Sequence, residues 1–158
     1  MSDLAVADLA YVPRRLFWLD GEGRRHTLSE DELIAQRGPV VVLAEPGAGK
    51  SELFRQAAAV TGAPLVTATK WLRTVRPEEL VRPDLPILID ALDEASARRD
   101  GDAVQRVLEK LDAAGGPRFV LSCRAADWEA RAATGIAQDY GGRPLICHLE
   151  PFSRVEAE

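Results

Sequence analysis

The chain of 158 residues has few of the features that mark disulfide-rich, zinc-binding, exported or membrane proteins. Its two cysteines, Cys123 and Cys147, lie within apolar runs and lack the spacing of a zinc site or a disulfide framework. Its apolar runs are far shorter than the ~20 residues of a spanning helix, and its N-terminus lacks the layout of a signal peptide. The sequence therefore predicts a cytoplasmic protein with no membrane partner.

An excess of positive charge is also lacking. Asp and Glu number 25 against 20 Lys and Arg, which gives a formal net charge of −5 without a strongly basic footprint for DNA or RNA. We therefore expect no nucleic-acid partner. The composition is otherwise that of a globular chain, 46% hydrophobic and 28% charged, and the length suits one core.

The first 38 residues read as a leader to the main fold. Two strand-like runs flank the turn Gly21-Glu22-Gly23, which is a hairpin signal. Ser29 and Glu32 then resemble a capping box that opens a short helix, which Gly38-Pro39 ends. The expected divisions are a leader at 1–38, a core at 39–153 and a tail at 154–158 that begins a missing lid.

In the core, apolar strands alternate with helices. Continuous apolar runs are typical of parallel strands buried on both faces, and apolar residues at helical spacing occur between them. This alternation predicts an α/β fold, a three-layer parallel sheet of about five strands. The expected strands are 40–44, 64–68, 87–90, 118–123 and 145–149, and the expected helices are 50–60, 77–81, 103–111 and 127–133.

The most specific motif runs from Ala44 to Ser51. Its Gly-Lys-Ser end matches the phosphate-binding loop GxxxxGK[ST], with Ala44 in place of the usual first glycine. The loop's backbone N–H groups and the helix N-terminus would face phosphate oxygens. Lys50 would bridge the β- and γ-phosphates, and Ser51 would bind Mg²⁺. The alternative is a glycine-rich turn that only caps a helix. The expected nucleotide-binding residues are Glu45, Pro46, Gly47, Ala48, Gly49, Lys50 and Ser51.

A second motif closes the expected strand at 87–90. Asp90 stands at its carboxyl end, where a carboxylate holds the magnesium of a neighbouring phosphate loop, usually through a water. Asp93 and Glu94 follow, and either could orient or deprotonate a water that attacks the γ-phosphate. Which of the two is the base stays open, and a solvated acidic turn is the alternative.

The expected strand at 118–123 leads into Arg124. If this strand lies beside the phosphate-loop strand, Arg124 emerges near the γ-phosphate and can sense or stabilise its charge. A surface ion pair with Asp127 is the alternative role. The chain has no Asn and no [NT]KxD guanine-reading motif, which favours ATP over GTP.

Together these motifs resemble the nucleotide-binding core of NACHT-type ATPases of the STAND class, over residues 11–153. This resemblance implies an ASCE-like P-loop core that binds ATP or ADP with Mg²⁺ and switches signalling, as in a bacterial or antiviral defence regulator. It also implies catalytic roles for Asp93, Glu94 and Arg124. The segments that carry it are Glu45-Pro-Gly-Ala-Gly-Lys-Ser51, Asp90-Ala-Leu-Asp-Glu94, Ser122-Cys123-Arg124, Tyr11-Val12-Pro13 and His148-Leu-Glu-Pro-Phe-Ser153.

Members of that family carry a helical lid, a winged-helix segment and repeat sensors beyond this core. The resemblance therefore implies protein partners or missing C-terminal domains, and we expect the chain alone to be a monomer and a weak Mg²⁺-dependent ATPase. Oligomers are expected only of a full-length parent. The alternatives are an AAA+-like ATPase, a P-loop phosphotransferase acting on a small metabolite, and an interaction module that holds nucleotide without hydrolysing it.

Overall fold

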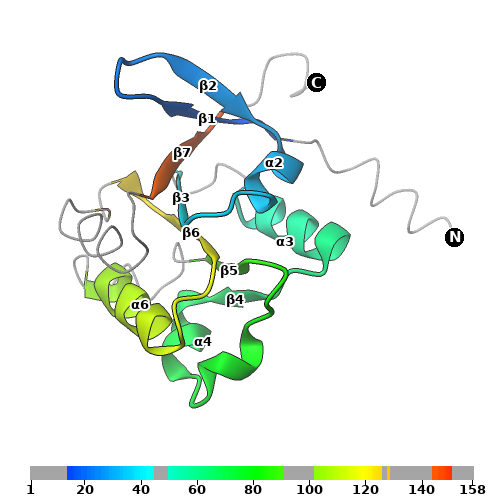
Figure 1. Cartoon of the computed structure of the whole chain (residues 1–158), viewed down its shortest axis with the longest axis vertical. Helices are drawn as coiled ribbons and strands as arrows, with labels where there is room; N and C mark the ends of the chain where they lie inside the picture. Colours follow the sequence, from blue (N-terminus) through cyan, green and yellow to red (C-terminus); the bar gives the residue numbers. More distant parts are fainter. Residues whose placement is uncertain (1–13, 45–49, 91–101, 126–127, 129–143, 151–158) are drawn as a thin grey trace, which may run out of the picture.

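The computed structural model describes residues 14–44, 50–90, 102–125, 128 and 144–150 (Figure 1). At residues 50, 51, 102 and 103 this description covers the backbone alone. Of the predicted helix at 127–133 only Trp128 lies within the described residues, so this helix stays a prediction.

The described strands form one mixed sheet, in the order β2-β1-β7-β3-β6-β5-β4 (Figure 1). The strands β7, β3, β6, β5 and β4 are parallel, whereas β1 pairs antiparallel with both β2 and β7. The strands are β1 (Leu16–Leu19), β2 (Arg25–Leu28), β3 (Val40–Leu43), β4 (Leu65–Thr67), β5 (Ile87–Asp90), β6 (Phe119–Cys123) and β7 (Leu145–Leu149). The helices are α2 (Glu30–Ile34), α3 (Lys50–Thr61), α4 (Ala68–Arg73), the 3-10 helix η1 (Pro77–Leu80) and α6 (Asp102–Ala113).

Helices cover both faces of this sheet. The side chains of β3 are all buried and alternate between two cores. Val41 and Leu43 join the core under α4 and α6, while Val40 and Val42 join the core under α2 and α3. The predicted α/β class, with a largely parallel sheet between two helical layers, is confirmed.

The predicted number of about five strands is wrong, because the described residues already form a sheet of seven. The five expected core strands are present, and the hairpin that we interpreted as a leader adds β1 and β2 at the edge beside β7. Leu16 of β1 lies opposite Leu149 of β7, and the guanidinium of Arg14 donates a hydrogen bond to the carbonyl of Glu150. These partners are more than a hundred positions apart, so local sequence patterns do not reveal the pairing.

The sequence did not predict α4. The strand expected at 64–68 ends at Thr67, whose hydroxyl accepts a hydrogen bond of 3.1 Å from the backbone N–H of Lys70 and so caps a helix. The helix buries Trp71, whose Nε1 donates to the carbonyl of Val107 in α6 at 3.4 Å. A Thr at the end of a short apolar run is the signal that this helix offered.

Lys110 joins the two helices on this face of the sheet. Its Nζ, from α6, donates to the carbonyls of Leu72 at 2.9 Å and Thr74 at 2.6 Å. These carbonyls lie at the C-terminal end of α4, where helix carbonyls lack partners within the helix and the dipole favours a cation. Lys110 therefore caps α4 from the neighbouring helix.

Candidate functional site

Among the described residues, the carboxyl ends of the parallel strands place Asp90 and Arg124 at one edge of the sheet, beside the start of the phosphate-loop motif. β6 lies between β3 and β5, so the condition under which we expect Arg124 near the phosphate-loop motif is met. Ala44 follows β3, Asp90 ends β5 and Arg124 follows β6. Ligands of open α/β sheets bind at this edge, where the strand order changes direction.

The phosphate-loop motif has the local context that its chemistry requires. β3 precedes it and α3 begins at Lys50, so the motif joins a buried strand to a helix N-terminus. The backbone N–H of Ala44 donates a bond of 3.1 Å to the carbonyl of Cys123, which ties the start of the motif to the end of β6. Residues 45–49 and the side chains of Lys50 and Ser51 lie outside the described part, so their roles stay predictions.

Asp90 stands in a row of polar side chains that crosses three strands. It is half-buried and lies in register with Thr67 of β4 and with Ser122 of β6. Their strand neighbours Leu65, Leu88 and Val120 pack in the core under α3, so the alternation of side chains puts this row on the α3 face. Ser122 donates to Oδ1 of Asp90 at 3.1 Å. Asp93 and Glu94 lie outside the described residues.

Arg124 is half-buried just past the end of β6. Its Nε is buried and has no hydrogen-bond partner in the described part of the chain. An unsatisfied buried donor costs about 1–3 kcal/mol, more when the group is charged, so its presence calls for an explanation. An anion bound at this edge is one explanation, and Asp127, the other predicted partner, lies outside the described residues.

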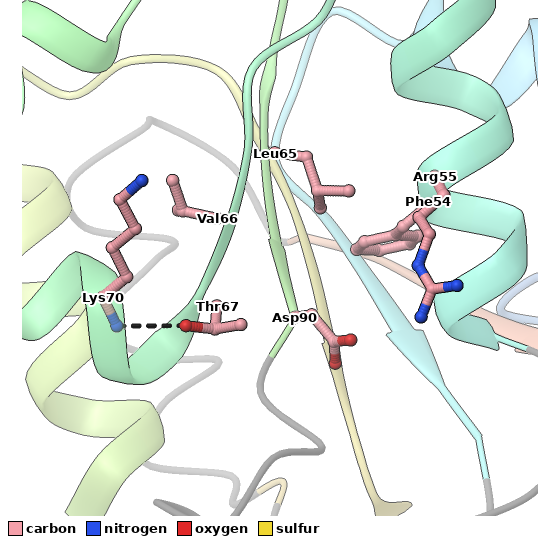
Figure 2. Close-up of a pocket in the computed structure, with 7 residues that line it drawn as sticks. All are labelled: Phe54, Arg55, Leu65, Val66, Thr67, Lys70 and Asp90. Atoms are coloured by element: carbon pink, nitrogen blue, oxygen red, sulfur yellow. Dashed lines mark hydrogen bonds between the residues drawn. The ribbon is translucent and has the colours of Figure 1, made fainter.

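A cavity of about 270 Å³ opens beside Asp90, between α3 and the outermost strand β4 (Figure 2). Phe54 and Arg55 of α3 line one side of it, while Val66 and Lys70 lie on the other side of β4 (Figure 2). Phe54 is buried, and Arg55 is largely exposed and forms an ion pair with Glu52. The lining residues are Phe54, Arg55, Leu65, Val66, Thr67, Lys70 and Asp90.

The metal-binding potential of this edge is modest. Among the described residues no group of three or more His, Cys, Asp and Glu side chains is arranged to hold a metal ion. A Mg²⁺ ion in a nucleotide site takes most of its ligands from phosphates and water and needs only one or two from the protein. The carboxylate of Asp90 and the hydroxyl of Ser51, a predicted ligand, would supply these. Both donors are hard oxygens, so their chemistry fits that ion.

Neither cysteine is among the residues that line the cavity beside Asp90. Cys123 and Cys147 are buried and form no disulfide, and burial raises the pKa of Cys147 to about 12. A thiol with so high a pKa is a poor nucleophile at neutral pH.

In the described segments no helix is both long and apolar enough to cross a membrane.

Comparison with protein-family models finds no match to this sequence, and comparison with curated proteins finds no significant similarity. The functional argument therefore rests on the motifs and on the geometry of this edge.

Sequence reasoning missed two members of the polar row. It treated Ser122 only as part of a strand end, and it assigned no role to Thr67. A polar residue inside an otherwise apolar strand run, as Ser122 is, was the available signal. Its contact with Asp90 depends on the register of β5 against β6, which the sequence alone does not show.

Proposed function

We propose that the chain is the core of an ATP-dependent nucleotide switch, an ASCE-like P-loop ATPase similar to the NACHT-type members of the STAND class. The observation that carries the proposal is the strand order β3-β6-β5 at the centre of the sheet. In this order the carboxyl end of β3, Asp90 and Arg124 lie along one edge of the sheet. The chain that leaves β3 there leads to the N-terminus of α3. The cellular setting proposed with it is cytoplasmic signalling or antiviral defence.

In this proposal the phosphate-loop residues hold ATP or ADP. The backbone N–H groups of residues 45–49 and the N-terminus of α3 bind phosphate oxygens, and Lys50 neutralises the β- and γ-phosphates. Mg²⁺, when bound, neutralises phosphate charge and polarises the γ-phosphate. Ser51 and Asp90 are the residues that would hold it.

The proposed hydrolysis is slow. Asp93 or Glu94 activates the attacking water. The Nε of Arg124, which has no hydrogen-bond partner among the described residues, provides a donor for the γ-phosphate. Exclusion of water from the γ-phosphate, by a lid or by a partner protein, would speed this step. We expect residues 1–158 by themselves to bind nucleotide loosely, to hydrolyse it slowly and to be a monomer.

Calorimetric titration with ATP and ADP tests this proposal. We expect Lys50→Ala to weaken nucleotide binding at least tenfold in Mg²⁺ and Asp90→Asn to weaken only the Mg²⁺-dependent part. Arg106→Ala, which removes an exposed cation from α6, is the control and should bind as the unmodified chain does. Nucleotide binding unchanged by Lys50→Ala, or absent from the unmodified protein, would refute the proposal.

A phosphate-release assay identifies the base. Glu94→Gln and Asp93→Asn should both retain nucleotide, and the one that replaces the base should lose turnover. Normal turnover in both variants would exclude the two acids as catalytic bases. Tight binding with brisk turnover by the unmodified chain would show that it needs no added lid.

The cavity beside Asp90 favours a second candidate, a P-loop phosphotransferase that acts on a small metabolite. Small-molecule sites are commonly about 300–1,000 Å³, and this cavity of about 270 Å³ has room for a compact acceptor. Mass spectrometry after incubation with ATP and a mixture of small alcohols and amines would detect a phosphorylated product. Leu65→Trp should fill the cavity and stop transfer while nucleotide binding continues. Release of inorganic phosphate alone would favour the switch.

A further inference from the structure

Ser122 is a buried hydroxyl in a strand that is otherwise apolar. Its side chain is 0% exposed, whereas the polar and charged side chains of the described residues are otherwise almost all at least partly exposed. The strand β6 reads Phe-Val-Leu-Ser-Cys and lies between β3 and β5, so Ser122 is in the middle of the sheet. An apolar residue would suit this environment better unless the hydroxyl has a partner.

The hydroxyl has two acceptors and one hydrogen. Oγ lies 3.1 Å from Oδ1 of Asp90 and 3.5 Å from the carbonyl of Ile89. An ionised carboxylate can only accept, so Ser122 is the donor in the first contact. The bond to Asp90 is the shorter of the two and is strengthened by charge, so it takes the hydrogen in preference to the carbonyl.

This bond fixes the orientation of a carboxylate at a strand end. Asp90 is the last residue of β5, where the ladder that restrains the backbone stops. Ser122 lies opposite it in register and is itself held between two neighbouring strands. With Oδ1 engaged by this hydrogen bond, the carboxylate loses freedom about its side-chain torsions.

We propose that Ser122 is the positioning residue of the magnesium site, holding Asp90 in the orientation that receives the ion or its water. This inference rests on the proposed nucleotide function. Residues that hydrogen-bond a metal ligand typically change metal affinity by about 10–100-fold when they are removed. Ser122 acts through Asp90 and has no role in binding the nucleotide itself.

The test measures ADP binding to the chain of 158 residues by calorimetry at a series of Mg²⁺ concentrations. We expect Ser122→Ala to raise the half-saturating Mg²⁺ concentration about tenfold and to leave ADP affinity in EDTA unchanged. Ser122→Thr keeps the hydroxyl and should restore Mg²⁺ dependence. Ser122→Cys keeps the shape of the side chain with a slightly larger sulfur and donates weakly, so its Mg²⁺ requirement should fall between those of Ala and Ser.

Combining Ser122→Ala with Asp90→Asn separates positioning from packing. If Ser122 acts through Asp90, Ser122→Ala should have no further effect on Mg²⁺ dependence in the Asp90→Asn background. Additive losses, or an equal loss of ADP affinity with and without Mg²⁺, would overturn the inference. Urea unfolding of each variant measures packing directly, and a Mg²⁺ shift that follows stability across Ala, Cys and Thr would also overturn it.

The titration of the unmodified chain distinguishes the two levels of failure. Absence of ADP binding there refutes the proposed function and this inference with it. Mg²⁺-dependent binding that needs Asp90 but ignores Ser122→Ala refutes the inference alone and leaves the proposed function intact.

Discussion

The cap that Lys110 supplies to α4 predicts a measurable loss of stability when its charge is removed. Lys110→Met keeps the aliphatic stem and deletes the donor that bonds Leu72 and Thr74 at 2.9 and 2.6 Å. Each charge-assisted hydrogen bond contributes about 1.5–3 kcal/mol. Because Leu72 and Thr74 are both half-exposed, water replaces part of this contribution, and we expect a net loss of about 2 kcal/mol in the free energy of unfolding.

The assay is urea unfolding followed by tryptophan fluorescence, with thermal unfolding beside it. A loss of about 2 kcal/mol corresponds to a fall in Tm of about 4–8 °C for a chain of this length. Lys70→Met is the matched control, because Lys70 is exposed on α4 itself and its Nζ bonds no described residue. We expect the control to change stability by less than about 0.5 kcal/mol.

Lysine acylation gives a second reading of the same bonds. The chain has only three lysines, Lys50, Lys70 and Lys110, so each can be followed by mass spectrometry. An amine that donates two short hydrogen bonds should be acylated more slowly than the exposed Lys70. Equal stability losses in Lys110→Met and Lys70→Met, together with equal acylation of the two amines, would refute the capping role.

Three further predictions concern the thiol, the hairpin and the core. Burial raises the pKa of Cys147 from 9.0 to about 12, so at pH 8 its alkylation should be about a thousandfold slower than that of an ordinary thiol. In urea the alkylation rate should return to that of an ordinary thiol. Fast alkylation of the folded chain would contradict this prediction. The hydrogen bond from His26 lowers the pKa of Asp20 below 3.8, so its stabilisation is present above 3.8 and is lost as the pH falls through the lowered value. His26→Ala should raise the NMR titration midpoint of Asp20, and an unmoved midpoint would count against the bond. Trp71→Ala should lower the free energy of unfolding by about 3–5 kcal/mol. Trp71→Phe should lower it by less, because Phe loses only the hydrogen bond to Val107 and keeps most of the buried volume. Equal losses in the two variants would show that buried volume does not determine the effect.

Local sequence patterns predicted the elements better than their arrangement. The run 40–44 was predicted as a strand because apolar residues in succession need burial on both faces. The structure forms β3 over Val40–Leu43, and all four of its residues are buried. The position of β1 was not predictable, because it depends on the pairing of Leu16 with Leu149. Likewise, the strand expected at 64–68 left no place for a helix that begins at Ala68. A single Thr within an apolar run is a weak signal of a helix cap.

The candidate site divides in the same way. The position of Asp90 at a strand end was predicted from its place after Ile87–Ile89, and the structure puts it there. The bond from Ser122 was not predicted, because one residue of slip between β5 and β6 would turn the side chain to the other face. The expected roles of Asp93 and Glu94 stay predictions.

The order of strands in the sheet also determines when the molecule can be completed during synthesis. β3 is central, yet both of its neighbours, β6 and β7, come much later in the chain, and β1 also waits for β7. Until the ribosome has released residues 119–149, the nascent chain carries a hydrophobic strand with two open edges and a hairpin with no third strand. Such edges pair readily with other chains. Long-range pairings of this kind also slow folding. Among the described strands β7 emerges last, and it pairs with both β1 and β3, so it joins the hairpin to the parallel strands. We therefore expect nascent chains shorter than about 145 residues to depend on chaperones, and the yield of folded protein to be set at this final step.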